Sequence, residues 1–202
     1  HNGDRTVYRL AFAGGGWTSD ILKPKHSYTF PAGATSDCYE MFSRCGQNNK
    51  EDDGMVDVSF ACAKFDFSKC SKVDNLFANS YVKNITVDFS KATTLNNTFY
   101  VGDGGKMDNI KLKVSKGCTY NSTFAWNQFL KSIEFLDGSE IGNSISFDRS
   151  NLLTEASVKS IVDHLAEVTT SPTITFHTNV KSQTWFTTEL IAKITQKGWT
   201  LP

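Results

Sequence analysis

Apolar and polar residues alternate along three segments in the middle of the chain. Each segment ends at a Ser-Lys dipeptide, and its alternating apolar positions are Ala63, Phe65 and Phe67, then Ile85, Val87 and Phe89, then Ile110, Leu112 and Val114. A period of two is typical of a β-strand with one buried face. The pattern therefore predicts three short strands whose intervening polar side chains point outward.

The three strands belong to a repeat. The serines of the dipeptides, Ser68, Ser90 and Ser115, are 22 (90 − 68) and 25 (115 − 90) residues apart. A phenylalanine follows each serine at the same distance, at Phe77, Phe99 and Phe124. Periods of this length are typical of a solenoid built from one short strand per coil. We expect the three phenylalanines to stack opposite the sheet, with asparagine side chains holding the turns before them.

The outward residues of these strands are the candidate binding face, called the sheet face below. Its members are Asp66, Thr86, Asp88, Lys111, Lys113 and Glu134. Ile133-Glu134-Phe135 and Ile145-Ser146-Phe147 are predicted to continue the sheet, which would add Ser146. Asp66 and Asp88 occupy equivalent positions, so their repulsion calls for an offsetting charge such as Lys113, unless the acids bind a cation or a basic partner.

The two ends of the chain lack the repeat. Residues 1–35 are predicted to form an irregular N-terminal cap containing a short strand near Tyr28, and residues 36–150 form the solenoid, with Phe42 at the spine position of its first coil. Residues 151–202 are predicted to form an α/β cap, all within one continuous domain. Its expected elements are a helix over about 154–168 capped by Thr154, a strand at 173–176, a helix capped by Thr187 or Thr188 that ends at Gly198, and a last strand at 199–201.

Two insertions are expected as exposed loops, at 45–54 and 101–106, and both are candidate contributors to binding. The first contains an acidic cluster, but it lacks the alternating ligands of a calcium loop. The Gly14-Gly15-Gly16 run lacks the Lys-Ser/Thr of a phosphate-binding loop and is interpreted as a turn.

Composition excludes several classes of function. The 202 residues carry 21 basic and 21 acidic side chains, so nothing indicates an electrostatic surface for nucleic acid or membranes. No run approaches the roughly 18 apolar residues of a membrane span. The chain opens with His1-Asn2 and no initiator methionine, which predicts that it is part of a longer protein.

The five cysteines do not have metal-binding spacing. Buried free thiols are the favoured interpretation, because cysteine packs as a small apolar residue. One disulfide within a set of four is the alternative, and that set is Cys38, Cys45, Cys62 and Cys70.

The sequence predicts no enzyme, and neither a catalytic residue, a cofactor nor a metal is assigned. His177 and Asp148 each follow a predicted strand and would approach each other if those strands paired, but no nucleophile completes a triad. Three aromatic residues are candidates for stacking on sugar rings, with a core or cap role as the alternative for each: Tyr100, Trp126 and Trp185.

Phrases at both ends of the chain carry a family resemblance. They include Asp4-Arg5-Thr6, Gly16-Trp17, Lys23-Pro24-Lys25 and Met41-Phe42 near the start, and Leu153-Thr154 and Lys197-Gly198-Trp199-Thr200-Leu201 near the end. With these phrases the chain resembles leucine-rich-repeat-type, surface-antigen-like short-repeat proteins of gut-bacterial phages and prophages. Phenylalanine and isoleucine replace most of the leucines.

The resemblance implies an α/β, leucine-rich-repeat-like solenoid with a C-terminal strand-helix cap. It implies a virion-associated protein linked to a tail or fibre, or an adhesin on the bacterial surface, and no catalytic residues. The implied partners are a bacterial surface protein or glycan, or other virion proteins, with a homo-oligomer within a larger assembly as a further possibility.

Three hypotheses follow for function. The first is a binding module that recognises a host protein or glycan through the sheet face and the two loops. The second is an architectural or decoration domain of a phage particle with no host ligand. The third is a carbohydrate-active enzyme on a parallel β-helix, which requires a close pair of outward carboxylates in a groove.

Overall fold

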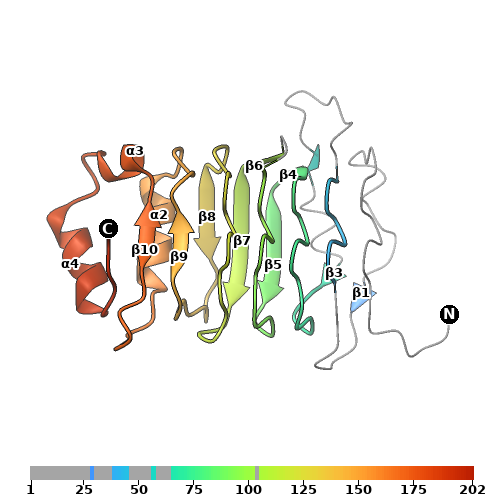
Figure 1. Ribbon diagram of the computed structural model, residues 1–202, viewed down its shortest axis with the longest axis horizontal. Helices are drawn as coiled ribbons and strands as arrows, with labels where there is room; N and C mark the ends of the chain where they lie inside the picture. Colours follow the sequence, from blue (N-terminus) through green and yellow to red (C-terminus); the bar gives the residue numbers. More distant parts are fainter. Residues whose placement is uncertain (1–27, 30–37, 46–55, 58–64, 103–104) are drawn as a thin grey trace.

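The chain coils into a parallel β-solenoid in the computed structural model, which describes residues 28–29, 38–45, 56–57, 65–102 and 105–202 (Figure 1). Successive coils lie side by side along the long axis, and the helices gather at the C-terminal end. Most of the predicted N-terminal cap, most of the 45–54 loop and the centre of the 101–106 loop lie outside the described residues.

The main sheet contains β5 (Ile85–Phe89), β7 (Asn109–Val114) and β8 (Ser132–Phe135), parallel and in that order. Residues at alternate positions of each strand are buried, and the residues between them face solvent. The period of two in the sequence therefore produces the buried layer that it predicts.

A second set of short strands runs beside the main sheet. β2 (Val56–Asp57), β4 (Tyr81–Lys83) and β6 (Lys106–Met107) form a parallel sheet, and β1 (Tyr28–Thr29) pairs with β3 (Phe65–Asp66). The predicted strand near Tyr28 is thereby confirmed. A coil can contribute two strands rather than the single strand expected, because Asn84 with φ of 59° turns the chain between β4 and β5.

A column of stacked phenylalanine rings forms the opposite side of the core. Adjacent ring centroids lie 4.8 to 6.0 Å apart along the column Phe42, Phe77, Phe99, Phe124, Phe147 and Phe176. The rings are close to parallel, and Phe186 closes the C-terminal end with an edge contact at 5.6 Å. The spine predicted from three phenylalanines is confirmed, together with Phe42, and Phe147 and Phe176 extend it beyond the predicted positions.

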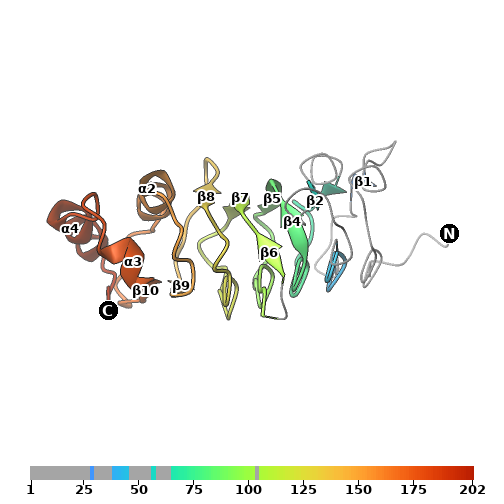
Figure 2. The ribbon, with the colours of Figure 1, turned by 90° about the horizontal axis from the view of Figure 1, so that it is seen from above.

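The placement predicted for Ile145–Phe147 is wrong. These residues form β9, which pairs with β10 (Ile174–Phe176) and not with β8. Figure 2 shows β9 and β10 on the side opposite β5, β7 and β8. Phe147 follows Phe124 by 23 residues (147 − 124), which is about one repeat. Its ring therefore takes the next place in the spine, against Phe124, and this contact holds β9 on the spine side. Ser146 therefore does not belong to the sheet face.

Helix α2 (Glu155–Asp163) takes the place beside β8 that a further strand would fill (Figure 2). The Ile133 N–H donates to Ser157 Oγ at 3.1 Å, and the Phe135 N–H donates to Ser160 Oγ at 2.9 Å. The two hydroxyls thereby satisfy donors that an open sheet edge would leave exposed to strand pairing. Thr154 caps the helix as predicted.

The helix is shorter than the predicted 154–168 and ends at Asp163. The chain then extends alongside the preceding coil, where the Ile141 N–H donates to the His164 carbonyl and the Ala166 N–H donates to the Ile141 carbonyl, both at 2.9 Å. Leu165 is buried in this extended segment rather than in a helix. Its helical spacing from Ile161 in the sequence is therefore misleading.

The C-terminal cap otherwise follows the prediction closely. α4 (Thr188–Gln196) is capped by Thr187 and ends before Gly198 with φ of 85°. A short helix, α3 (Thr178–Lys181), was not predicted, and the expected strand at 199–201 is reduced to one bridge between Thr173 and Thr200.

Gly198 allows a test of the cap. A Cβ at this position would lie 1.9 Å from the Val168 carbonyl oxygen, and φ lies in the left-handed region. We expect Gly198→Ala to lower the free energy of unfolding by more than about 1 kcal/mol. Gly117→Ala is the matched control, because no atom lies within 4 Å of its added Cβ. Urea denaturation of both variants measures the difference, and equal stabilities would contradict this account of the cap.

The described cysteines are Cys38, Cys45, Cys70 and Cys118, and all four are buried thiols outside any disulfide. The favoured interpretation is confirmed for these residues, while Cys62 lies outside the described part of the chain. Burial raises the pKa of Cys118 to about 12. The Sγ atoms of Cys38 and Cys70 lie 2.8 Å apart, across neighbouring coils.

Candidate binding surfaces

The centre of the sheet face is a row across three strands. Thr86 pairs in register with Lys111, and Lys111 pairs with Glu134. Lys111 Nζ and the Glu134 carboxylate form an ion pair at 2.7 Å, with both side chains about half exposed at 54% and 51%. The backbone pairing of β5, β7 and β8 thus fixes the order of these side chains along the surface.

A second row contains the predicted acid and its offsetting lysine. Asp88 and Lys113 are register partners on β5 and β7, as expected. Asp66 and Asp88 also have a structural role, because their Oδ1 atoms accept hydrogen bonds from the Ser68 and Ser90 N–H groups at 3.0 and 2.8 Å. The hydrogen bond with the Ser68 side chain is the main cause that holds the pKa of Asp66 below its usual value. The repeated aspartate therefore stabilises the turn after its strand.

A third row was missed in the sequence. Asn109 Nδ2 donates to Asn84 Oδ1 at 3.2 Å, and Ser132 Oγ donates to Asn109 Oδ1 at 2.8 Å. The signal was present, because these residues precede Thr86, Lys111 and Glu134 by two positions and must share their face. The sheet face therefore consists of three parallel rows: a hydrogen-bonded amide and hydroxyl row, a mixed row and an acid-lysine row.

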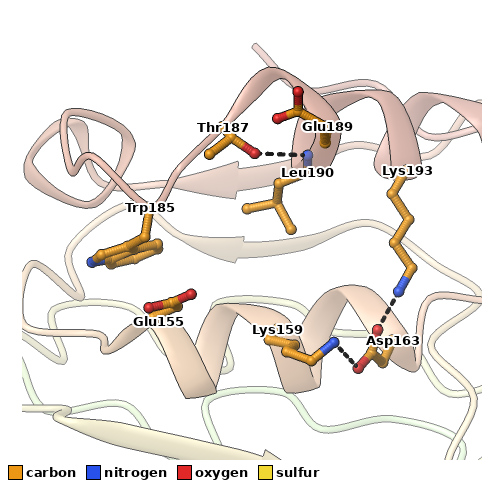
Figure 3. Close-up of a pocket in the computed structure, with 8 residues that line it drawn as sticks. All are labelled: Glu155, Lys159, Asp163, Trp185, Thr187, Glu189, Leu190 and Lys193. Carbon is orange, nitrogen blue, oxygen red and sulfur yellow. Dashed lines mark hydrogen bonds and ion pairs between the residues drawn. The ribbon is translucent and has the colours of Figure 1, made fainter.

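A pocket of about 350 Å³ lies between α2 and α4 (Figure 3). Asp163 closes one end of the pocket, where it forms ion pairs with Lys193 and with Lys159, the latter at 3.2 Å. The indole of Trp185 stands at the other end, beside Glu155. Because Trp185 and Leu190 also pack against the core, the pocket walls are part of the C-terminal cap.

Asp163 gives the cap a pH dependence. Partial burial raises the pKa of Asp163, but the hydrogen bonds from Lys193 and Lys159 outweigh this effect, so the pKa lies below the usual 3.8. A lowered pKa in the folded state means that the ion pairs stabilise the fold above pH 3.8 and that this contribution is lost as the pH falls through the lower folded value.

We therefore expect Asp163→Asn to reduce the free energy of unfolding by about 0.5–1 kcal/mol at neutral pH, since the pairs are partly exposed. The difference from the parent should shrink as the pH falls below the folded pKa of Asp163. Urea denaturation at several pH values measures it. A difference that stays constant down to full protonation of the carboxylate would contradict the assignment.

The three aromatic candidates differ in exposure. Tyr100 and Trp185 are half-buried, whereas 54% of Trp126 is exposed. The guanidinium of Arg149 lies 4.7 Å from the centroid of the Trp126 ring. Trp126 is therefore neither a core nor a cap residue. Of its two interpretations, only the candidate role in stacking on sugar rings remains.

The strands before Asp148 and His177 do pair, as the sequence argument required. The side chains of Asp148 and His177 each interact with residues close to them in the sequence. His177 Nδ1 accepts the Asn179 N–H at 3.0 Å and caps α3, and Asp148 forms an ion pair with Arg149 at 3.8 Å.

Comparison of the chain with models of known protein families, with curated proteins and with solved structures finds no match. Among the described residues, no helix has the length and apolar character needed to cross a membrane. The same residues contain no group of three or more His, Cys, Asp or Glu side chains positioned to hold a metal ion.

Proposed function

We propose that the protein is a non-enzymatic recognition module, carried on a virion or on the bacterial cell surface, that binds a host protein or glycan. The observation that carries the proposal is the sheet face, on which three rows of polar side chains are held in register by one parallel sheet. Solenoids commonly use such extended surfaces for binding.

Two further points support the proposal. The polar groups of the face are held before a partner arrives, by the Lys111–Glu134 ion pair and by the ladder from Asn84 to Ser132, which reduces the entropy lost on binding. The resemblance to leucine-rich-repeat-type proteins of gut-bacterial phages and prophages supports the virion or surface location and the leucine-rich-repeat-like class of the solenoid.

The test is a quantitative pull-down of the labelled chain on intact gut-bacterial cells. The face variant replaces Thr86, Lys111, Lys113 and Glu134 with alanine, and it spares Asp66 and Asp88 because they hold turns. The control replaces one threonine, two lysines and one glutamate that are exposed and do not belong to the three rows: Thr170, Lys116, Lys159 and Glu167.

We expect strain-selective binding that the face variant loses and the control retains. If the face variant keeps strain-selective binding, the binding site lies on a surface other than the sheet face. A parent that binds no strain would contradict host recognition and favour the second candidate, an architectural domain. The internal pairing of Lys111 with Glu134 is the observation that favours this second candidate, because a neutralised surface suits permanent assembly.

A further inference from the structure

A second polar surface lies on the spine side of the solenoid, opposite the sheet face. Its main feature is a groove of about 370 Å³ across three successive coils, lined by Glu40, Ser43, Arg44, Asn75, Ala78, Asn79, Asn97 and Tyr100. The segment 38–45 that starts the groove lies on the side opposite β5, β7 and β8 (Figure 2). This volume lies within the range of small-ligand sites.

The groove is built from left-handed turns. Four of the six spine phenylalanines, Phe42, Phe77, Phe99 and Phe124, follow a residue with positive φ two positions earlier, at Glu40, Asn75, Asn97 and Ser122. Three turns have another such residue two positions after the ring, at Arg44, Asn79 and Trp126. Backbone hydrogen bonds between neighbouring turns, such as Asn97 N–H to Asn121 O at 3.0 Å, keep these positions aligned.

Glycine would adopt this conformation without strain, and asparagine tolerates it. None of the seven positions is a glycine, and three of them hold the unfavourable residues Glu40, Arg44 and Trp126. A turn selected only for folding has no reason to keep such side chains, so strain of this kind points to a functional role.

The chemistry of the groove suits an uncharged, hydroxyl-rich ligand. The half-buried amides of Asn75 and Asn97 each offer donor and acceptor atoms in one plane, and a sugar with neighbouring hydroxyls needs that combination. Glu40 and Arg44 carry opposite charges, so the lining as a whole is neutral. Tyr100 supplies an aromatic ring at the C-terminal end of the groove.

Trp126 extends the surface by one coil. The Val101 N–H donates to the Ala125 carbonyl at 3.3 Å, which places the turn of Trp126 directly beside the turn of Tyr100. The guanidinium of Arg149 lies over one face of the exposed Trp126 ring, 4.7 Å from its centroid, which leaves the other face as an apolar platform for a pyranose.

We infer that this spine-side groove, together with Trp126, binds a neutral glycan chain that runs along the solenoid axis. The inference rests on the proposed recognition function and places glycan binding on a different face from the sheet face. The amides and the Glu40–Arg44 pair would hydrogen-bond the hydroxyls, and Tyr100 and Trp126 would stack on sugar rings.

The left-handed positions allow variants that remove a side chain while keeping the turn. We would replace Glu40, Asn97 and Trp126 together with glycine, which suits their positive φ. Ser171→Gly is the matched control, because Ser171 also has positive φ (52°) but lies in the C-terminal cap. Thermal unfolding should show that the triple variant is no less stable than the parent.

The binding assay is native electrophoresis through gels containing mannan, dextran or xyloglucan, with polygalacturonic acid as the charged comparison. We expect retardation of the parent and of Ser171→Gly by at least one neutral polysaccharide, and affinity on the order of tenfold or more weaker in the triple variant. Retardation only by polygalacturonic acid, equal retardation of the triple variant, or no retardation by any neutral polysaccharide would each overturn the inference.

The cell pull-down separates this inference from the proposed function. Strain-selective cell binding without any retardation by the neutral polysaccharides would overturn the glycan groove and leave the recognition function intact. Absence of both kinds of binding would overturn both.

Discussion

Phe99→Ala should reduce the free energy of unfolding by about 3–5 kcal/mol, which is a large share of the stability of a domain of this size. Phe99 is fully buried at the middle of the phenylalanine spine, with ring centroids of Phe77 and Phe124 at 5.9 and 5.4 Å. The substitution removes both stacking contacts and leaves a cavity between coils that backbone hydrogen bonds hold at a fixed spacing.

Equilibrium urea denaturation followed by far-UV circular dichroism measures the loss. Leu152→Ala is a suitable control, because 47% of Leu152 is exposed and surface substitutions usually change stability by no more than about 0.5 kcal/mol. A loss in Phe99→Ala that is no larger than the loss in Leu152→Ala would show that the spine does not hold the coils together.

Ser157→Ala combined with Ser160→Ala should reduce the free energy of unfolding by about 2–5 kcal/mol. The two changes leave the Ile133 and Phe135 N–H groups without acceptors, and Ser157 is itself buried. Each buried donor left unsatisfied costs about 1–3 kcal/mol. Because alanine has the higher helix propensity, the helix itself would gain stability, so a net loss reports directly on the contact between α2 and the edge of β8.

Lys159→Ala is the control on the same helix, since Lys159 is exposed and its loss removes only one partly exposed ion pair, which is expected to contribute less than about 1 kcal/mol. Hydrogen exchange adds a local measurement, in which the amides of Ile133 and Phe135 should lose protection first. A double variant as stable as the parent, with both amides still protected, would contradict the role given to the two serines.

The sequence predicted those parts of the fold that depend on local periodicity. Strands β5, β7 and β8, the caps of α2 and α4, and the first spine positions all followed from alternation, capping residues and the repeated phenylalanine. The wrong placement of Ile145–Phe147 shows where this reasoning fails. Its alternation fits a strand on either side of the coil, and only the contact of Phe147 with Phe124 decides between them.

Interactions between coils account for the rest of what was missed. The hydroxyls of Ser157 and Ser160 look like ordinary helix residues until β8 is placed against them. The ladder from Asn84 to Ser132 was within reach of the strand register, whereas the spine-side groove depends on left-handed turns that local patterns do not reveal. The outward residues of β5, β7 and β8 could be read from the sequence, because period two fixes which residues point outward. Ser146 and Asp66 are the exceptions, since β9 pairs with β10 and β3 pairs with β1 rather than with the main sheet.

The central claim is that the protein is a recognition module whose ordered polar faces do the binding. Cell binding by four proteins in one assay tests it most directly: the parent, the sheet-face variant, the groove variant with glycine at three positions, and the exposed-residue control. The account predicts strain-selective binding by the parent and the control, with loss in at least one of the two face variants. Equal binding by all four proteins, or none by the parent, would contradict it.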